Sequence, residues 1–372
     1  MMPFTILSSY AAKRKSFEVF VDKIAHLVYT MIKLYTIFRV CIPEGDFQMS
    51  ISTVHSRLSL ERIEAASRII DPIFTNTPQF RAEKLEPFLG SLQLVVKVET
   101  INPIGSFKGR GTDYFVSQLK EPMPIVCASS GNFGQGLAYA TRKRNYSFTV
   151  FAAENANPRK VKAMQRLGAQ VQLVGKDFDA AKLTAAEYAQ QTGAYFVEDG
   201  REAAVTEGMG SIAVELTRWP QPFDTVLVPL GNGALINGIG RWFKAHSPHT
   251  QIIGVSPTGS PAMERSWRSN TLVTLPQIET VADGIGIRTP VPEALEDMKG
   301  LIDDILLVDD QALIEAVRLL YFEMGLLVEP SGAAGLAAAM VFKERFADQL
   351  VATPLCGSNL SLEQQQSWLW TC

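Results

Sequence analysis

The chain has few of the side chains that hold metals or build disulfide frameworks. Its 372 residues include four cysteines and four histidines. The cysteines are widely scattered and form no C-x-x-C pair, a pattern that favours reduced thiols in the cytoplasm. The histidines form neither H-E-x-x-H nor a Cys/His ligand set. The sequence therefore argues against a zinc enzyme and against a disulfide framework.

Charge of one sign and uninterrupted apolar runs are also scarce. Lys and Arg number 35 against 38 for Asp and Glu, a formal net charge of -3, so the chain lacks the basic excess that nucleic acid binding needs. The apolar stretch 18–42 is interrupted by charges such as Lys23 and Arg39, whereas a membrane-spanning helix needs roughly 20 mainly apolar residues. We expect a small-molecule partner, no nucleic acid and no membrane.

Residues 1–48 are predicted to be an extension of doubtful function. They lack the order of basic, apolar and small-residue regions that marks a signal peptide. Met49 then begins M-S-I-S-T-V-H-S-R-L-S-L-E-R-I-E-A-A, which looks like the start of a domain. The chemistry is expected beyond this point.

From about Leu92 onward, short β-branched runs alternate with longer amphipathic stretches. This alternation is typical of a parallel sheet covered by helices, and strands buried on both faces read as continuous apolar runs. The predicted fold is α/β and two-lobed, with parallel-rich twisted sheets flanked by helices. The candidate strands are 92–99, 124–128, 147–152, 169–174, 225–230, 251–256, 304–309 and 350–355.

Four turns that follow these strands are rich in Gly, Ser and Asn. Open α/β sheets bind ligands outside the carboxyl ends of their strands, so these turns are expected to gather at one cleft. Their sequences are I-N-P-I-G-S-F-K-G-R-G (101–111), S-S-G-N-F-G-Q-G (129–136), L-G-N-G-A-L-I-N-G (230–238) and C-G-S-N-L-S (356–361).

The first turn contains Lys108 between small residues. Desolvation in a dry cleft lowers the pKa of a lysine and makes it a competent Schiff-base nucleophile. Taken alone the lysine is weak evidence, because most lysines are solvated surface charges, and the turn lacks the G-x-x-x-x-G-K-[ST] pattern of a nucleotide-binding loop.

The second and third turns are predicted to bind anions. The backbone of Gly231, Asn232, Gly233, Ala234 and Leu235 precedes a helix-like segment and is predicted to cradle a phosphate. The alternatives are glycines that only tighten the turn and a dinucleotide site, which the spacing G-x-G-x-x-x-x-G disfavours.

The turn of Ser129, Ser130, Gly131 and Asn132 opens another helix and suits a substrate carboxylate. The alternative for these residues is ordinary helix capping.

At this point the motifs resemble those of the fold-type-II, tryptophan-synthase-beta-like family of pyridoxal-phosphate enzymes, which includes serine and threonine dehydratases and serine racemase. The resemblance runs from about Leu58 to the C-terminus. It starts at T-N-T-P-Q-F and continues through K-V-E-T-I-N-P-I-G-S-F-K-G-R-G and S-S-G-N-F-G-Q-G. It ends with A-D-G-I-G-I-R-T-P, L-V-E-P-S-G-A-A-G and C-G-S-N.

The resemblance implies a role for several residues. Lys108 looks like the lysine that carries the cofactor as a Schiff base, with Phe107 packed near the cofactor ring. Asn132 is expected to bond the ring oxygen, and 231–235 to bind the phosphate. Cys356 matches the position that faces the pyridine nitrogen, although the cysteine taken by itself is better explained as a small buried apolar residue. Glu207 and Glu329 are further candidates near the cleft, with a surface or helix-capping role as the equal alternative for either.

Within the family the chain looks most similar to the hydroxy-amino-acid dehydratases. The implied reaction is β-elimination, in which a small amino acid such as L-serine or L-threonine yields a 2-oxo acid and ammonia after Lys108 removes the α-proton. Ser130 resembles the opposite-face acid/base of serine racemases, so racemisation is an alternative. Phe133 stands where dehydratases commonly have histidine, and G-N-G-A (231–234) partly resembles threonine synthase. A β-replacement or threonine-synthase-like enzyme and a catalytically lapsed pseudoenzyme therefore remain open.

The resemblance also implies the organisation of the chain. A large cofactor-binding domain is expected from 49–123 and 202–372, and a small domain that closes over the substrate from 124–201. The protein is expected to be a cytoplasmic homodimer, and a monovalent or divalent cation is a further expectation, with Glu215 and Asp224 as candidate ligands.

Overall fold

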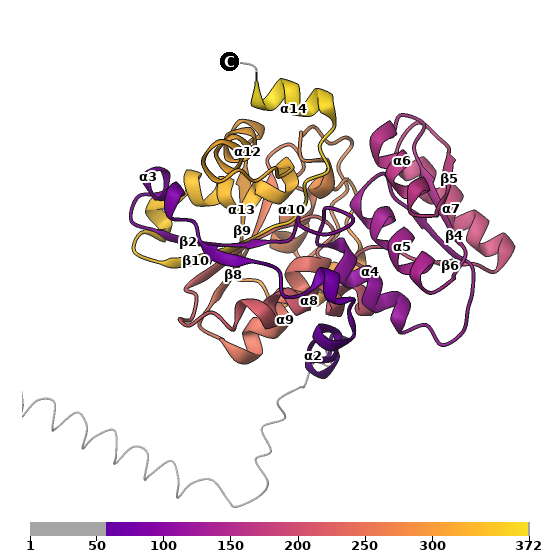
Figure 1. The fold of residues 1–372 in the computed structure, drawn as a ribbon, viewed down its shortest axis with the longest axis horizontal. Coiled ribbons are helices and arrows are strands. Elements are labelled where there is room, and N and C mark those ends of the chain that lie inside the picture. The colour runs from indigo at the N-terminus through magenta and orange to yellow at the C-terminus, as the bar shows by residue number, and fades with distance from the viewer. Residues whose placement is uncertain (1–56, 371–372) are drawn as a thin grey trace, which may run out of the picture. The chain divides into compact units, whose positions relative to one another are not determined.

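The computed structural model describes residues 57–370 (Figure 1). The predicted extension at residues 1–48 lies outside the described residues. Two sheets and their covering helices form one compact unit in this part of the chain. Within residues 57–370, no helix is long and apolar enough to cross a membrane.

The larger sheet has six strands in the order β1-β2-β10-β7-β8-β9. All neighbouring pairs are parallel except β1 with β2. The last strand in the chain, β10, therefore lies in the middle of the sheet. The strands are β1 (Gln79–Arg81), β2 (Gln93–Val98), β7 (Thr225–Pro229), β8 (Gln251–Pro257), β9 (Asp304–Val308) and β10 (Leu350–Leu355).

Both faces of this sheet are buried, and the side chains of β7 show why residues 226–229 of this strand are apolar. Leu227 packs into the cluster formed with α12 (Asp310–Met324) and α13 (Pro330–Val341). Val226 and Val228 pack into the cluster formed with α8 (Ala203–Leu216) and α9 (Ala234–His246). Successive side chains of a strand point to opposite faces, so each face needs its own apolar residues. Figure 1 shows α8 and α9 on one side of the sheet and α12 and α13 on the other.

The smaller sheet has four parallel strands in the order β5-β4-β3-β6. Its strands are β3 (Ile125–Ala128), β4 (Phe148–Ala152), β5 (Gln170–Leu173) and β6 (Tyr195–Phe196). Val126 and Phe151 pack on Ala185 of α7 (Phe178–Thr192). Cys127 and Val150 belong to the core that contains residues of α5 (Asn132–Lys143) and α6 (Pro158–Arg166).

The helices follow the strands in the alternating order that the sequence predicts. The α-helices are α2 (Leu60–Ile69), α3 (Glu86–Leu89), α4 (Lys108–Ser117), α5 (Asn132–Lys143), α6 (Pro158–Arg166), α7 (Phe178–Thr192), α8 (Ala203–Leu216), α9 (Ala234–His246), α10 (Ala262–Ser269), α11 (Pro292–Asp297), α12 (Asp310–Met324), α13 (Pro330–Val341) and α14 (Leu362–Leu369). Short 3-10 helices are η1 (Pro72–Phe74), η2 (Glu83–Leu85), η3 (Asp283–Ile285) and η4 (Lys343–Phe346).

The predicted fold class is confirmed, and each of the eight predicted strands is present. Sequence reading missed β1 and β6, which are three and two residues long. The smaller sheet lies inside the span predicted for the small domain, 124–201, but the division into two domains remains a prediction.

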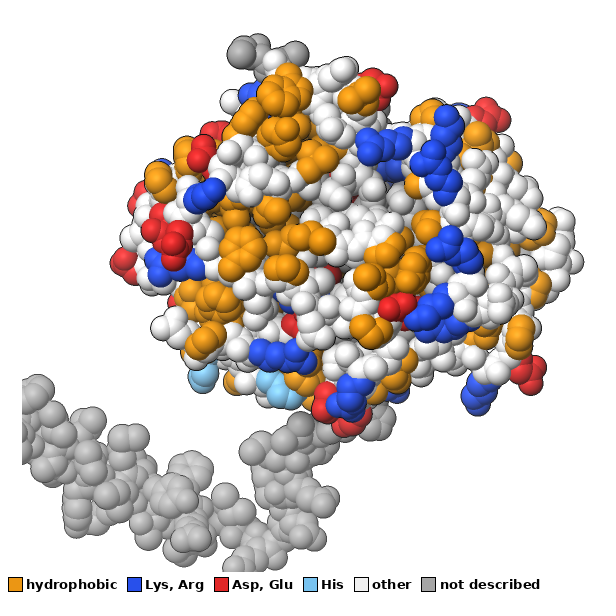
Figure 2. Space-filling view, viewed as in Figure 1, with side chains coloured by type: hydrophobic (Ala, Val, Ile, Leu, Met, Phe, Trp, Pro, Cys, Tyr) orange, Lys and Arg blue, Asp and Glu red, His pale blue; other side chains and the backbone are white. Residues whose placement is uncertain are grey.

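One face of the surface carries clustered apolar side chains. Figure 2 shows hydrophobic side chains over α14, where Trp370 is 62% exposed. The rings of Tyr321, Phe322 and Trp370 contact one another edge to face there, with centroids 5.2–5.8 Å apart. These residues lie at the far end of α12 and α14 and do not line the cavity described next.

Candidate active site

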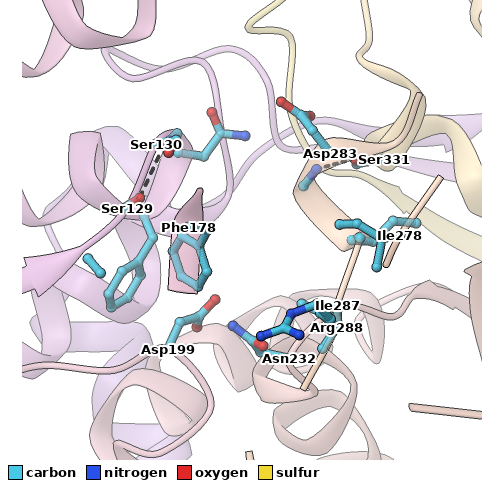
Figure 3. Close-up of a pocket in the computed structure, with 18 of the residues that line it drawn as sticks. Ser129, Ser130, Phe178, Asp199, Asn232, Ile278, Asp283, Ile287, Arg288 and Ser331 are labelled. Atoms are coloured by element: carbon cyan, nitrogen blue, oxygen red, sulfur yellow. Dashed lines mark hydrogen bonds between the residues drawn. The ribbon is translucent and has the colours of Figure 1, made fainter. Parts of the chain in front are cut away.

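A cavity of about 900 Å³ is lined by residues that follow strands of both sheets (Figure 3). The turns after β3, β7 and β10 and the start of α4 all contribute to its wall. These turns therefore lie together at one cavity, as predicted. The lining includes every residue predicted for the cofactor, catalysis or the substrate carboxylate: Phe107, Lys108, Ser129, Ser130, Gly131, Asn132, Gly231, Asn232, Gly233, Ala234, Leu235 and Cys356. Their individual roles remain predictions.

Lys108 is the first residue of α4, and its side chain is mostly shielded from solvent. The Nζ atom lies 2.6 Å from Oδ2 of Asp199 and 4.6 Å from the centroid of the Phe107 ring. The Phe133 ring centroid is 6.0 Å away. The lysine is thus held between a carboxylate and two aromatic rings. Sequence reading missed Asp199, because it follows the two-residue strand β6.

The lysine turn is fixed by backbone hydrogen bonds to the turn after β10. The amide of Phe107 donates to the carbonyl of Cys356 at 3.0 Å, and the amide of Ser358 donates to the carbonyl of Gly105 at 2.9 Å. Gly105 has φ +60°, and a Cβ there would lie 2.9 Å from Oγ of Ser358. Lys108 and Cys356 are therefore positioned together, although they are far apart in the sequence.

The turn after β7 provides a helix N-terminus that faces the cavity. Helix α9 begins at Ala234, preceded by Gly233 with φ +92°. The first N–H groups of a helix have no partner within the helix, and the helix dipole favours an anion at this end. A Cβ on Gly231 would lie 3.2 Å from the carbonyl oxygen of Gly284, so the glycine allows the two backbone segments to approach.

Some polar groups of the turn after β3 form hydrogen bonds within the fold, and others line the cavity. Oγ of Ser129 accepts hydrogen bonds from the amides of Gly131 (3.2 Å) and Gly134 (3.0 Å), so this hydroxyl shapes the start of α5. Nδ2 of Asn132 donates to Oε1 of Glu329 at 2.6 Å, which leaves the second hydrogen of the amide for a ligand.

Cys356 lines the cavity, and only 4% of its surface is exposed. Burial, together with the charge of Glu99, raises the pKa of its thiol well above the ordinary value. The thiol lies 3.5 Å from the carbonyl oxygen of Pro354, to which it donates. Cys356 is therefore a neutral thiol at physiological pH.

Glu329 and Lys160 are two further ionisable residues that line the cavity. Burial raises the pKa of Glu329, against the opposing charge of Lys160, and Oε2 of Glu329 has no hydrogen-bond partner within residues 57–370. Nζ of Lys160 lies 2.6 Å from Oδ2 of Asp283. Glu329 lies at the cavity, as predicted, whereas Glu207 is not among the lining residues and pairs with Arg62 of α2.

The candidate cation ligands Glu215 and Asp224 are not supported. Glu215 accepts hydrogen bonds from Arg110 and Lys97, and Oδ2 of Asp224 accepts one from the amide of Leu350. Across residues 57–370, no cluster of three or more His, Cys, Asp and Glu side chains could hold a metal ion. The carboxylate of Glu215 is committed to a buried ion-pair network instead.

The residues of the cavity fit pyridoxal phosphate. The cavity contains a lysine amine, a helix N-terminus suited to a phosphate, a neutral thiol, and two carboxylate oxygens, on Asp199 and Glu329, without hydrogen-bond partners in the described part of the chain. A cavity of this size can hold a cofactor together with a small substrate.

Comparisons with known proteins agree with this chemistry. The family model described as pyridoxal-phosphate dependent enzyme matches residues 70–357. An L-threonine ammonia-lyase from Geobacter sulfurreducens is 31% identical, over 73% of this chain and 68% of the relative. An L-threo-3-hydroxyaspartate ammonia-lyase from a Pseudomonas species is 30% identical, over 86% of this chain and 99% of the relative.

A solved structure is also similar. Maize serine racemase is 26% identical with a TM-score of 0.78, over 83% of this chain and 96% of that one. The resemblance predicted from the sequence is confirmed by the family match and these relatives, and the chain belongs to the family of pyridoxal-phosphate-dependent enzymes.

Proposed function

We propose that the protein is a pyridoxal-phosphate-dependent ammonia-lyase that dehydrates and deaminates a small hydroxy amino acid, such as L-serine or L-threonine, to a 2-oxo acid and ammonia. The observation that carries the proposal is one cavity lined by the Lys108 amine, the N-terminus of α9 and the neutral Cys356 thiol. The named ammonia-lyases among the relatives support this reaction class.

The cavity contains residues that could bind the aldehyde, the phosphate and the ring nitrogen of the cofactor. Lys108 would bind the cofactor covalently, and the backbone of 231–235 would hold its phosphate. The Cys356 thiol would face the ring nitrogen and leave it unprotonated, because a neutral thiol does not stabilise a positive charge as a carboxylate does. When bound, pyridoxal phosphate supplies an electron-withdrawing ring that stabilises negative charge at the substrate α-carbon.

The protein itself supplies positioning and proton transfer. The turn of Ser129 to Asn132 opens α5, and the backbone N–H groups of Ser130 and Asn132 would orient the substrate carboxylate, because those of Ser129 and Gly131 donate within the fold. Nζ of Lys108 would then take the α-proton. Phe107 and Phe133, each no more than 8% exposed, border the lysine and limit the access of water.

A substrate assay tests the proposal. Purified protein loaded with pyridoxal phosphate is incubated with L-serine or L-threonine, and pyruvate, 2-oxobutyrate and ammonia are measured. Lys108→Ala is expected to abolish product and the visible absorbance of the bound cofactor, with Lys120→Ala as a control on an exposed lysine. Wild-type protein that takes up cofactor but forms no oxo acid would contradict the proposed reaction.

Racemisation is a second candidate. The Ser130 side chain lines the cavity, and maize serine racemase is a structural relative. Chiral chromatography of the same reaction measures D-serine. If Ser130 supplies the second proton, Ser130→Ala will abolish D-serine while oxo acid continues to form. O-acetylserine as substrate tests β-replacement. A wild-type protein that binds pyridoxal phosphate but converts none of these substrates would identify a catalytically lapsed pseudoenzyme.

The protein's localisation, oligomeric state and domain closure can also be proposed. We propose a cytoplasmic homodimer in which residues 124–201 close over the substrate. These expectations rest on the family resemblance, and the separate four-stranded sheet within 124–201 supports the last of them. Light scattering of the full chain measures the oligomeric state. X-ray scattering with and without substrate measures closure.

A further inference from the structure

Asp199 is the charged partner that Lys108 meets in the cavity. Its Oδ2 lies 2.6 Å from Nζ of Lys108, and the two side chains are 13% and 15% exposed. Its Oδ1 is buried and has no hydrogen-bond partner within residues 57–370. A charge-assisted hydrogen bond in such a shielded place is stronger than one between neutral groups, so this pair governs where Nζ lies.

The backbone around Asp199 fixes the carboxylate in this position. Gly200 has φ +89°, and a Cβ there would lie 2.8 Å from the carbonyl oxygen of Asn232. The segment that carries Asp199 is therefore packed against the turn proposed to hold the cofactor phosphate. Figure 3 shows Asp199 and Asn232 close together on one wall of the cavity.

The carboxylate of Glu198, the residue before Asp199, has other partners. Glu198 pairs with Lys182 and Arg201, and no contact between Glu198 and Lys108 is present in the described residues. Glu198 and Asp199 are adjacent in sequence, yet only the second faces the lysine. A substitution at Glu198 therefore removes a carboxylate from the same loop without removing the partner of Lys108.

We infer that Asp199 is a positioning residue that holds Nζ of Lys108 at the cavity wall and stabilises the positive charge Nζ carries after it accepts a proton from the substrate α-carbon. This inference deepens the proposed function and rests on Lys108 as the base. In the step, the lone pair of the neutral amine takes the proton and the C–H electron pair stays with the substrate. The ammonium formed donates a hydrogen bond to Oδ2 of Asp199, which remains a carboxylate.

Hydrogen exchange tests the step without requiring dehydration. L-Alanine has no β-hydroxyl to lose, so the loaded enzyme in D₂O exchanges its α-hydrogen only, and NMR measures the rate. Asp199→Asn keeps the size of the side chain and removes its charge. We expect exchange to fall roughly 10- to 100-fold, the range that a lost charged hydrogen bond or a misplaced catalytic group produces. Glu198→Gln is the control and should exchange at the wild-type rate.

A second measurement uses protein without cofactor. Acetic anhydride acylates accessible amines, and the charge-assisted hydrogen bond to Asp199 holds Nζ of Lys108 at the cavity wall, so Asp199 should protect Lys108 from acylation. Mass spectrometry of the Lys108 peptide should show faster acylation, by about tenfold, in Asp199→Asn, but not in Glu198→Gln. Asp199→Glu restores the charge and should again slow acylation, which a purely structural role would not explain.

The results of these experiments distinguish a failure of the Asp199 role from a failure of the proposed dehydratase function. Wild-type rates of exchange and acylation in Asp199→Asn would overturn the role of Asp199, and so would equal acylation in the Asn and Glu variants. Wild-type protein that exchanges alanine but forms no oxo acid from serine or threonine would contradict the dehydratase proposal and leave the role of Asp199 standing.

Discussion

Nη1 of Arg110 lies 2.7 Å from Oε1 of Glu215, and neither side chain is more than 4% exposed. Arg110 follows Lys108 by two residues in α4 and also pairs with Glu99 at the end of β2. Lys97 completes the cluster at 2.5 Å from Glu215. Two cations and two carboxylates thus balance one another in the interior, and they join β2, α4 and α8 beneath the lysine turn.

Removing one member of this cluster is expected to destabilise the fold. Arg110→Met leaves the buried Glu99 without its ion-pair partner and leaves Glu215 with Lys97 alone, a change that costs about 3–5 kcal/mol in comparable sites. Urea denaturation followed by circular dichroism measures the loss of unfolding free energy. Arg68→Met removes an exposed ion pair with Glu64 and should cost under about 1 kcal/mol. Equal losses in the two variants would show that the buried cluster contributes no more than a surface pair.

The same cluster predicts a loss of stability in acid. Burial opposes the charge of Glu215, but Arg110 and Lys97 outweigh it and lower the pKa of Glu215 to about 2, from the ordinary 4.5. A lowered pKa stabilises the folded state above pH 4.5, and this contribution is lost as the pH falls toward 2. The difference is on the order of 3 kcal/mol. Stability curves across this pH range should be steeper for the wild type than for Glu215→Gln, and parallel curves would contradict the assignment.

The buried thiols are expected to resist alkylation. Burial raises the pKa of Cys127 and of Cys356, and the thiolate is the reactive form. Iodoacetamide at pH 8 should therefore leave both peptides unlabelled in native protein and label both in urea, as mass spectrometry will show. Rapid labelling of Cys356 in native protein would mean that its thiol is accessible or ionised, and the argument for a neutral group at the ring nitrogen would fail.

Gly233 is expected to matter for cofactor affinity. A side chain at φ +92° is strained by roughly 1–2 kcal/mol, so in Gly233→Ala the turn relaxes and its N–H groups leave their positions. The dissociation constant for pyridoxal phosphate should rise about tenfold, measured by absorbance titration. Gly300→Ala is the matched control, because Gly300 has φ +72° and open space around its Cβ position. An equal loss of affinity in both variants would exclude a local effect at the turn.

The buried strands and the turns after them could be predicted because their signals are local. The strand around Val226 is a continuous apolar run, and the glycines after it identify the turn. Asp199 could not be predicted in this way, because β6 consists of Tyr195 and Phe196 alone and two residues show no periodicity.

The partner of Arg110 could not be predicted either. Glu215 is 105 residues away, and no local pattern indicates which buried charges will meet. Sequence reading therefore assigned Glu215 to a cation site, which the structure does not support.

The central position of β10 determines when the larger sheet can form during synthesis of the chain. Its neighbours β2 and β7 are both synthesised earlier, and β10 pairs with both of them. Until residues 350–360 leave the ribosome, the larger sheet has a gap in its centre and the turn of Lys108 lacks the backbone partners that Cys356 and Ser358 provide. Such long-range pairing forms late. The nascent chain can therefore fold helices and the smaller sheet earlier, but the cavity that contains Lys108 is completed only after residues 350–360 have left the ribosome.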